Sequence, residues 1–287
     1  RVYVTGSNAK MLSKEVATTF GGRFFIYDAY PYSFKEYLAA QHVELKEHWE
    51  YDTIQRSEVK RHLNEYFYYG GLPEILSFKN KRAMLSSLYQ KIYLGDICAR
   101  NNIKNDRVLN ILIKKMAESV KQPLSYNRLK NVIVATGSPI SVPTTIDYVD
   151  YASDSWLILP MENEVGKLTE KEMQKKYYFV DNGLLNLFLM NSETSLLENM
   201  VAVELCRRFG KKNVFFLNAE KEIDFIVPDE KLAIQVSYSI KDETTYNREV
   251  PPLVKYAKAH KDWKCLLITY DEEGTEEGIP VVPVWKW

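Results

Sequence analysis

The sequence predicts a multidomain protein that combines mixed α/β parts with helical parts. Residues 1–40 alternate strand, helix and strand, with apolar segments closed by glycine. Residues 41–160 carry helical periodicity through most of their length, whereas residues 191–287 return to short apolar strands separated by turn residues. A chain of 287 residues is long enough for two or three domains, each with its own core.

The first 40 residues predict the end of a parallel sheet. Val2 to Val4 form an apolar strand that runs into a Thr-Gly-Ser turn, a helix follows over about 13–19, and RFFIYDAY forms a second strand. Because the chain begins inside an apolar strand and without Met, we expect it to be a piece of a longer protein whose other strands precede Arg1.

Residues 41–104 predict a helical unit that follows a first helix, FKEYLAAQ. A helix over 57–69 ends at Gly70 and Gly71, and Pro73 is placed to start another. Residues 82–100 have the spacing of one long amphipathic helix. This unit is expected to be a lid next to the preceding sheet.

Residues 105–190 predict a winged helix-turn-helix. Three helical stretches cover about 106–120, 125–137 and 141–152, and Ser125 is placed to cap the second. The strands WLILPM and KKYYFVD then form a hairpin around a polar turn.

Residues 191–287 predict a small α/β domain. Its parts are the helix LLENMVAVELCRRFG, the strands NVFFLNA, EIDFIVPD and LAIQVSY, a helix over about 245–260, and the strands CLLITYD and VVPVWKW. We expect Glu198 and Asn199 to open the first of these helices, where a carboxylate suits the positive end of the helix dipole.

Composition narrows the function classes. Lys plus Arg and Asp plus Glu both number 38, so net charge gives no support for nucleic-acid binding. The three cysteines are widely spaced, which favours buried thiols in a cytoplasmic protein over a disulfide framework or a zinc site. Apolar runs such as CLLITY are far shorter than the roughly 20 residues of a membrane span, so no membrane partner is expected.

Short segments along nearly the whole chain carry a family resemblance. They are the Thr-Gly-Ser strand end, YPYSFKEYL, YGGLPEIL, YLGDICAR, DNGLL, LLENMVAVELCRR, EIDFIV, IQVSYSI and REVPPL. With these segments the chain resembles the prokaryotic AAA+-like ATPases that carry a C-terminal domain of unknown function with a restriction-endonuclease-like fold. The resemblance implies ATP and Mg²⁺ as cofactors of the intact protein.

The resemblance also implies nucleotide-sensing residues near the start of the chain. Thr5, Ser7 and Asn8 stand where a polar sensor reads the γ-phosphate, and Arg23 stands where an arginine finger would reach a neighbouring subunit's nucleotide. The Gly70-to-Pro73 turn resembles a lid motif that packs on nucleotide. The chain contains no GxxxxGK[ST] loop, so we expect no tight ATP binding or hydrolysis by this sequence alone.

The nuclease-like domain is expected to be degenerate. The resemblance places Glu204 on a helix and Asp224 on a strand, where a nuclease would hold Mg²⁺. Gln235 and Ser237 stand where a nuclease needs Glu-x-Lys. The negative charge of the glutamate and the positive charge of the lysine are therefore both missing, and no metal ion is expected at the site.

Two further hypotheses concern partners. The third helix of the winged-helix segment carries Asp147, Asp150 and Asp154, which would be repelled by phosphate, so the unit binds either a protein or DNA. The chain is also a candidate homo-oligomer.

The sensor-like strand end and the two binding-type units together favour a nucleotide-dependent switch. It would present the winged-helix and nuclease-like domains to a partner. The alternatives are a Mg²⁺-dependent DNA nuclease using Glu204, Asp224 and Gln235, and a pure interaction module.

Overall fold

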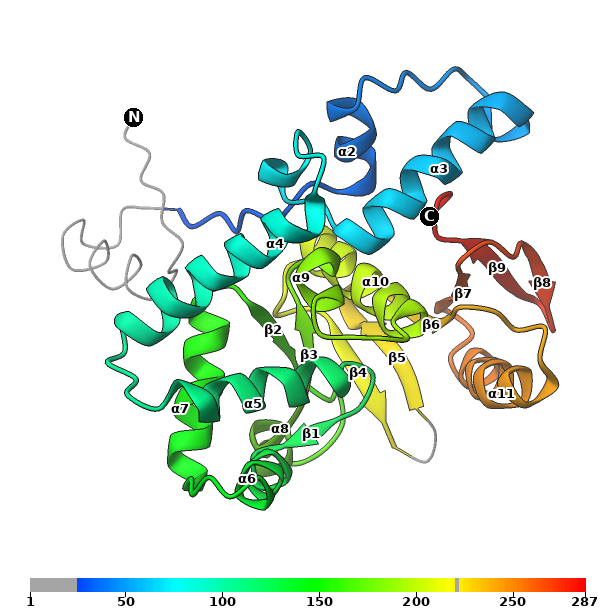
Figure 1. Cartoon of the computed structure of the whole chain (residues 1–287). Helices are drawn as coiled ribbons and strands as arrows, with labels where there is room; N and C mark the ends of the chain where they lie inside the picture. The colour runs from blue at the N-terminus through cyan, green and yellow to red at the C-terminus, as the bar shows by residue number, and fades with distance from the viewer. Residues whose placement is uncertain (1–24, 220–221) are drawn as a thin grey trace.

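The computed structural model describes residues 25–219 and 222–287, which form helices around two sheets (Figure 1). Helix α2 (Phe34–Ala40) starts at a capping box, in which Ser33 accepts a hydrogen bond from the Glu36 backbone and Glu36 accepts from that of Ser33. Helix α3 (Thr53–Tyr69) follows the short 3₁₀ helix η1 (Trp49–Tyr51) and is capped by Asp52. The expected helix over 57–69 is therefore present and begins one turn earlier.

The expected strand RFFIYDAY is wrong where the structure describes it. Residues 25–30 have no regular structure, and Phe25 and Tyr27 are exposed. No strand among the described residues pairs with this segment, so its backbone groups have no neighbouring strand with which to form the hydrogen bonds of a sheet. The rest of the expected strand–helix–strand unit lies outside the described residues.

The helical run continues with one departure from regular geometry. Pro73 opens only the 3₁₀ helix η2 (Pro73–Ile75) and not a full helix. Helix α4 (Lys81–Gln90) passes directly into the π-helix η3 (Lys91–Ala99), so the predicted helix over 82–100 is continuous but changes its hydrogen-bonding pattern.

The central unit contains four helices and a three-stranded sheet. Their order is α5 (Asp106–Glu118), β1 (Leu124–Ser125), α6 (Tyr126–Ala135), α7 (Val142–Asp154), β2 (Ile158–Met161), α8 (Leu168–Met173) and β3 (Gln174–Phe179). The sheet order is β1-β3-β2, and both pairings are antiparallel. Ser125 caps α6 as expected, and the polar turn of the predicted hairpin contains α8.

The last unit is a mixed six-stranded sheet flanked by two long helices. After the short α9 (Asn182–Asn186) come α10 (Glu193–Phe209), β4 (Phe215–Asn218), β5 (Glu222–Val227), η4 (Pro228–Glu230), β6 (Leu232–Ser237), α11 (Glu243–Ala259), β7 (Lys264–Thr269), β8 (Gly274–Glu276) and β9 (Ile279–Pro283). The strand order is β4-β5-β6-β7-β9-β8. Strands β6, β7 and β9 are parallel, and the remaining pairs are antiparallel.

The six-stranded sheet separates two apolar clusters. Phe225, Ile234 and Ile268 pack with α10 on one face, whereas Ala233 and Leu267 pack with α11 on the other. The strand period of two produces this division, because neighbouring residues point to opposite faces. Strands β5 and β6 thereby lie between the two helices. Within the described residues, none of the helices has the length and apolarity to cross a bilayer.

Candidate functional site

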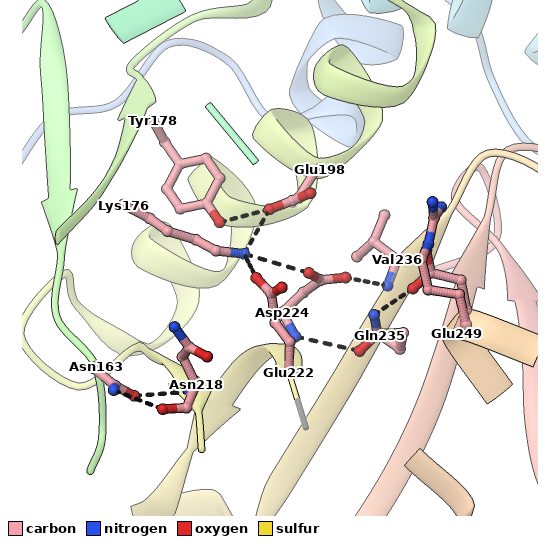
Figure 2. A network of polar contacts seen from close by, with 11 residues as sticks. Asn163, Lys176, Tyr178, Glu198, Asn218, Glu222, Asp224, Gln235, Val236 and Glu249 are labelled. Atoms are coloured by element: carbon pink, nitrogen blue, oxygen red, sulfur yellow. Dashed lines mark hydrogen bonds and ion pairs between the residues drawn. The ribbon is translucent and has the colours of Figure 1, made fainter. Parts of the chain in front are cut away.

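A fully buried lysine lies where the two sheets meet (Figure 2). The ammonium nitrogen of Lys176 on β3 is 2.9 Å from a carboxylate oxygen of Glu222, 3.2 Å from Glu198 and 3.4 Å from Asp224. Lysine is almost never fully buried unless it is paired, and here three carboxylates surround it. The cluster is the most concentrated group of charges in the interior of the described chain.

The strand period and the helix start bring this cluster together. Lys176 and Tyr178 are two residues apart on β3 and so share one face, and the Tyr178 hydroxyl donates to Glu198 over 2.8 Å. Helix α10 begins at Glu193, so the expectation that Glu198 and Asn199 open this helix is wrong. Glu198 lies in the second turn, where its side chain is buried against β3.

The polar network continues from Asp224 toward α11. Asp224 accepts a hydrogen bond from the Val236 backbone over 2.9 Å, and its own N–H donates to Gln235 over 3.3 Å. The Gln235 amide donates to Glu249 over 2.5 Å, and the exposed guanidinium of Arg248 is 2.7 Å from the same carboxylate. The network thus connects β3, α10, β5, β6 and α11.

Of the expected nuclease residues, the structure brings together Asp224 and Gln235 but not Glu204. Glu204 forms ion pairs with Arg207 and Arg208 at the end of α10 and has no contact with Asp224. Glu198, one and a half turns earlier, is the acidic residue of α10 that reaches the cluster. The nucleotide-sensing candidates Thr5, Ser7, Asn8 and Arg23 lie outside the described residues.

Proton affinities in the cluster follow from burial and from charge. Burial lowers the pKa of Lys176, but the carboxylates of Glu198, Asp224 and Glu222 more than offset it, so the net shift is upward and the ammonium stays charged. Burial, followed by repulsion from Glu198, raises the pKa of Asp224. Burial and the Asp224 charge likewise raise the pKa of Glu249. One fixed cation therefore holds two buried carboxylates, Glu198 and Asp224, together with the half-exposed Glu222.

These residues do not fit the Mg²⁺ that a nuclease would use. The carboxylates of Glu198, Asp224 and Glu222 converge on a point occupied by the Lys176 nitrogen. Across residues 25–219 and 222–287, no group of three His, Cys, Asp or Glu side chains has the geometry to hold a metal ion. Gln235 is the third expected ligand. Its side-chain oxygen accepts a hydrogen bond from the Asp224 N–H, and its amide nitrogen donates one to Glu249, so neither atom is free to bind a metal ion.

A second feature is the segment at residues 28–32, which we call the junction. Arg207 donates to the Pro31 carbonyl over 2.6 Å, and Lys211 pairs with Asp28 at 3.5 Å. Tyr30 packs edge-on against Trp156 with 5.5 Å between ring centroids. The junction therefore touches the end of α10 and the turn between α7 and β2.

The junction also contacts the Gly70-Gly71 turn. The Tyr32 backbone donates to the Gly71 carbonyl over 2.8 Å, and the Tyr66 hydroxyl donates to the Tyr32 carbonyl over 2.8 Å. The Gly71 N–H in turn donates to the buried carboxylate of Asp181 over 2.8 Å. A Cβ on Gly71 would lie 2.3 Å from the Tyr32 carbonyl oxygen, so only glycine fits this crossing.

Sequence reasoning missed Lys176, Asp181 and Arg207 as interaction centres. A period-two reading of KKYYF would have placed Lys176 on the same inward face as Tyr178, which is the available signal. Asp181 precedes Asn182 and Gly183 in DNGLL, a typical helix start, so its role as N-cap of α9 could be predicted from sequence. Its hydrogen bond from the Gly71 N–H could not. Nothing local distinguishes Arg207 from Arg208.

Comparison with known proteins finds two family models and two relatives that match the chain. An AAA domain family matches residues 1–38, and a domain of unknown function, DUF8612, matches residues 60–195. No solved structure matches the chain.

Two relatives match over the whole chain. One, described as an uncharacterized protein of Methanocaldococcus jannaschii, is 32% identical over 308 residues, covering 100% of this chain and 68% of the relative. Another, described as an uncharacterized protein of Haemophilus influenzae, is 31% identical over 296 residues, covering 100% of this chain and 70% of the relative. The chain therefore belongs to the family of these archaeal and bacterial proteins, and within it the AAA match precedes the match to the domain of unknown function.

Proposed function

We propose that the chain is part of a nucleotide-dependent switch, in which ATP bound by the AAA-type part sets the position of the units that follow. The AAA match over residues 1–38 supports nucleotide binding by the intact protein. The order α5-β1-α6-α7-β2-β3 supports a winged-helix unit, and α10-β4-β5-β6-α11-β7 supports a nuclease-like one.

The observation that carries the proposal is the junction. It lies within the AAA match and is bonded to the Gly70-Gly71 turn, to the turn before β2 and to the end of α10. A displacement of the AAA-type part would move these three contacts together, because each reaches the junction by a direct hydrogen bond or ring contact. Coupling between sites needs such a contiguous connection and two arrangements of it.

The partner that we propose is a protein with a basic surface. Asp147 and Asp150 are exposed on α7, the helix that a DNA-binding winged helix would place in the major groove. Carboxylates there would repel phosphate, whereas they would attract lysine and arginine side chains. Binding of duplex DNA to this face would contradict that part of the proposal.

The test is hydrogen exchange of the complete gene product with and without ATP and Mg²⁺. We expect nucleotide to change amide exchange in the junction, around residues 66–71 and at the end of α10. The Arg207→Ala variant should bind nucleotide as the wild type does but lose the change in α10, because it lacks the bond to Pro31.

The matched control is Arg208→Ala. Arg208 shares the ion pair to Glu204 but donates to Trp287 instead of the junction, so its removal should leave the ATP response intact. ATP binding without any exchange change beyond residue 38 would refute the switch. Tight ATP binding by the present 287-residue sequence alone would refute our account of where the nucleotide is held.

A further inference from the structure

We propose that Lys176 is a built-in cation, which takes the position that a divalent metal ion would occupy between Glu198, Glu222 and Asp224. On this view the ammonium group of Lys176 occupies the space between the carboxylates. The nuclease-like unit then keeps its fold but does not cleave nucleic acid with a metal ion. The inference rests on the nuclease-like unit of the proposed function but not on the nucleotide switch, so the two can fail separately.

The geometry of the cluster supports a replacement of metal by ammonium. Three carboxylates from two elements point at one nitrogen, with oxygen distances of 2.9 to 3.4 Å. Two further donors reach these carboxylates: the Tyr178 hydroxyl donates to the Glu198 oxygen that Lys176 also contacts, and the Val236 N–H donates to the second oxygen of Asp224. An ammonium group needs no coordination shell of water, so it can be held at 0% exposure where a metal ion would keep ligand waters.

The ammonium arrives from a different unit than the carboxylates. Lys176 belongs to the β2-β3 hairpin, whereas Glu198 lies on α10 and both Glu222 and Asp224 lie on β5. The hairpin is fastened beside the cluster, because the Asn163 amide donates to the Asn218 carbonyl over 3.1 Å and Asn218 N–H donates back over 2.9 Å. The docking of the hairpin on β4 therefore holds the Lys176 backbone beside the cluster.

Another role for Lys176 would be that of the nuclease lysine missing at Ser237. That role requires a metal ion between the same carboxylates and a lysine beside it. Here the nitrogen lies within 3.4 Å of both Glu198 and Asp224 and so fills the space between them. The two roles predict opposite responses to metal.

The test is thermal unfolding of the wild type, Lys176→Met and Lys175→Met with and without Mn²⁺. Methionine keeps about the length of the side chain but leaves the buried Glu198 and Asp224 and the half-exposed Glu222 without their cation. As the ammonium holds them, these carboxylates lack metal-binding geometry, so a Mn²⁺ site requires them to close inward once the lysine is gone. We expect Lys176→Met to bind Mn²⁺ in this way and to unfold about 5 °C higher at saturating Mn²⁺. The wild type should show no shift that EDTA reverses. Lys175 pairs with Glu162 and Glu172 outside the cluster, so Lys175→Met should also show none.

Further measurements keep the proposal falsifiable if Lys176→Met folds poorly. Refolding of that variant by Mn²⁺ would support the proposal, and failure of Mn²⁺ to rescue it would count against it. Lys176→Met/Asp224→Asn removes one carboxylate charge and should lose the Mn²⁺ response. Stoichiometric Mn²⁺ binding by the wild type, detected by electron paramagnetic resonance and abolished in Asp224→Asn, would overturn the proposal. Metal-dependent plasmid cleavage by the wild type would overturn it as well.

Discussion

Two buried charged side chains, Lys176 and Asp181, connect parts of the chain that are distant in sequence. Lys176 joins β3 to α10 and β5 through ion pairs, whereas Asp181 joins α9 to the Gly70-Gly71 turn through backbone hydrogen bonds. Removing one partner of such a buried group leaves the other without compensation, which is why these positions tolerate little change. Their environments differ, because three carboxylates compensate the charge of Lys176, whereas backbone N–H dipoles compensate that of Asp181.

Asp181 should impose a pH dependence on stability. Burial raises its pKa to about 6, although N–H bonds from Gly71, Leu184 and Gly183 act in the opposite direction. As pH rises from about 4 to about 6, the unfolded chain releases this proton before the folded chain does, so the free energy of unfolding falls. The shift corresponds to about 3 kcal/mol, lost as pH rises through the folded pKa.

The measurement is urea denaturation of wild type and Asp181→Asn at several pH values between 4 and 7. Asparagine cannot titrate, so the difference in free energy of unfolding between the two proteins should change by about 2 kcal/mol across this range, most of the full shift. Other acidic groups affect both proteins alike and cancel in the difference. A difference that stays constant with pH would contradict the raised pKa.

At the scale of elements, sequence predicted most helices and strands because their signals are local. Ser125 is followed by an amphipathic run, and EIDFIV, LAIQV and CLLIT are apolar runs bounded by turns. The strand over 25–30 failed because a strand requires a partner that sequence does not supply locally. Asp224 and Gln235 were predictable from their strands, but the pairing of Lys176 with them depends on how two sheets dock.

Helix α9 packs so closely on the end of α3 that its glycine is a steric requirement. A Cβ on Gly183 would lie 2.2 Å from the Tyr69 carbonyl oxygen. That neighbour is backbone and cannot rotate away, so Gly183→Ala should lower the free energy of unfolding by about 2–3 kcal/mol. Chemical denaturation would measure the loss.

Gly95 in the π-helix provides the matched control. An added Cβ there has no heavy atom within 4 Å, so Gly95→Ala should raise stability by about 0.5–1 kcal/mol through helix propensity. Equal effects of the two substitutions would show that packing of α9 on α3 does not determine the requirement for glycine at position 183.

At the scale of the whole molecule, the apolar interior crosses the unit boundaries predicted at 104 and 190. One contiguous cluster includes Leu63 of α3, Leu109 of α5, Phe179 of β3, Val201 of α10 and Ile268 of β7. Aromatic contacts add to it, since Phe67 packs against Tyr270 with 5.1 Å between ring centroids. Units that share buried surface to this extent lose much of their stability when a neighbour unfolds.

The described units should therefore unfold together. Differential scanning calorimetry of the chain should show a main transition whose van't Hoff and calorimetric enthalpies agree, because neither the helical part nor the six-stranded sheet buries its apolar surface alone. Tryptophan fluorescence should report the same midpoint, since Trp49 and Trp285 pack together from opposite ends of the described chain with 5.8 Å between ring centroids. Two separated transitions, with fluorescence following only one of them, would contradict a shared core and favour units that move independently.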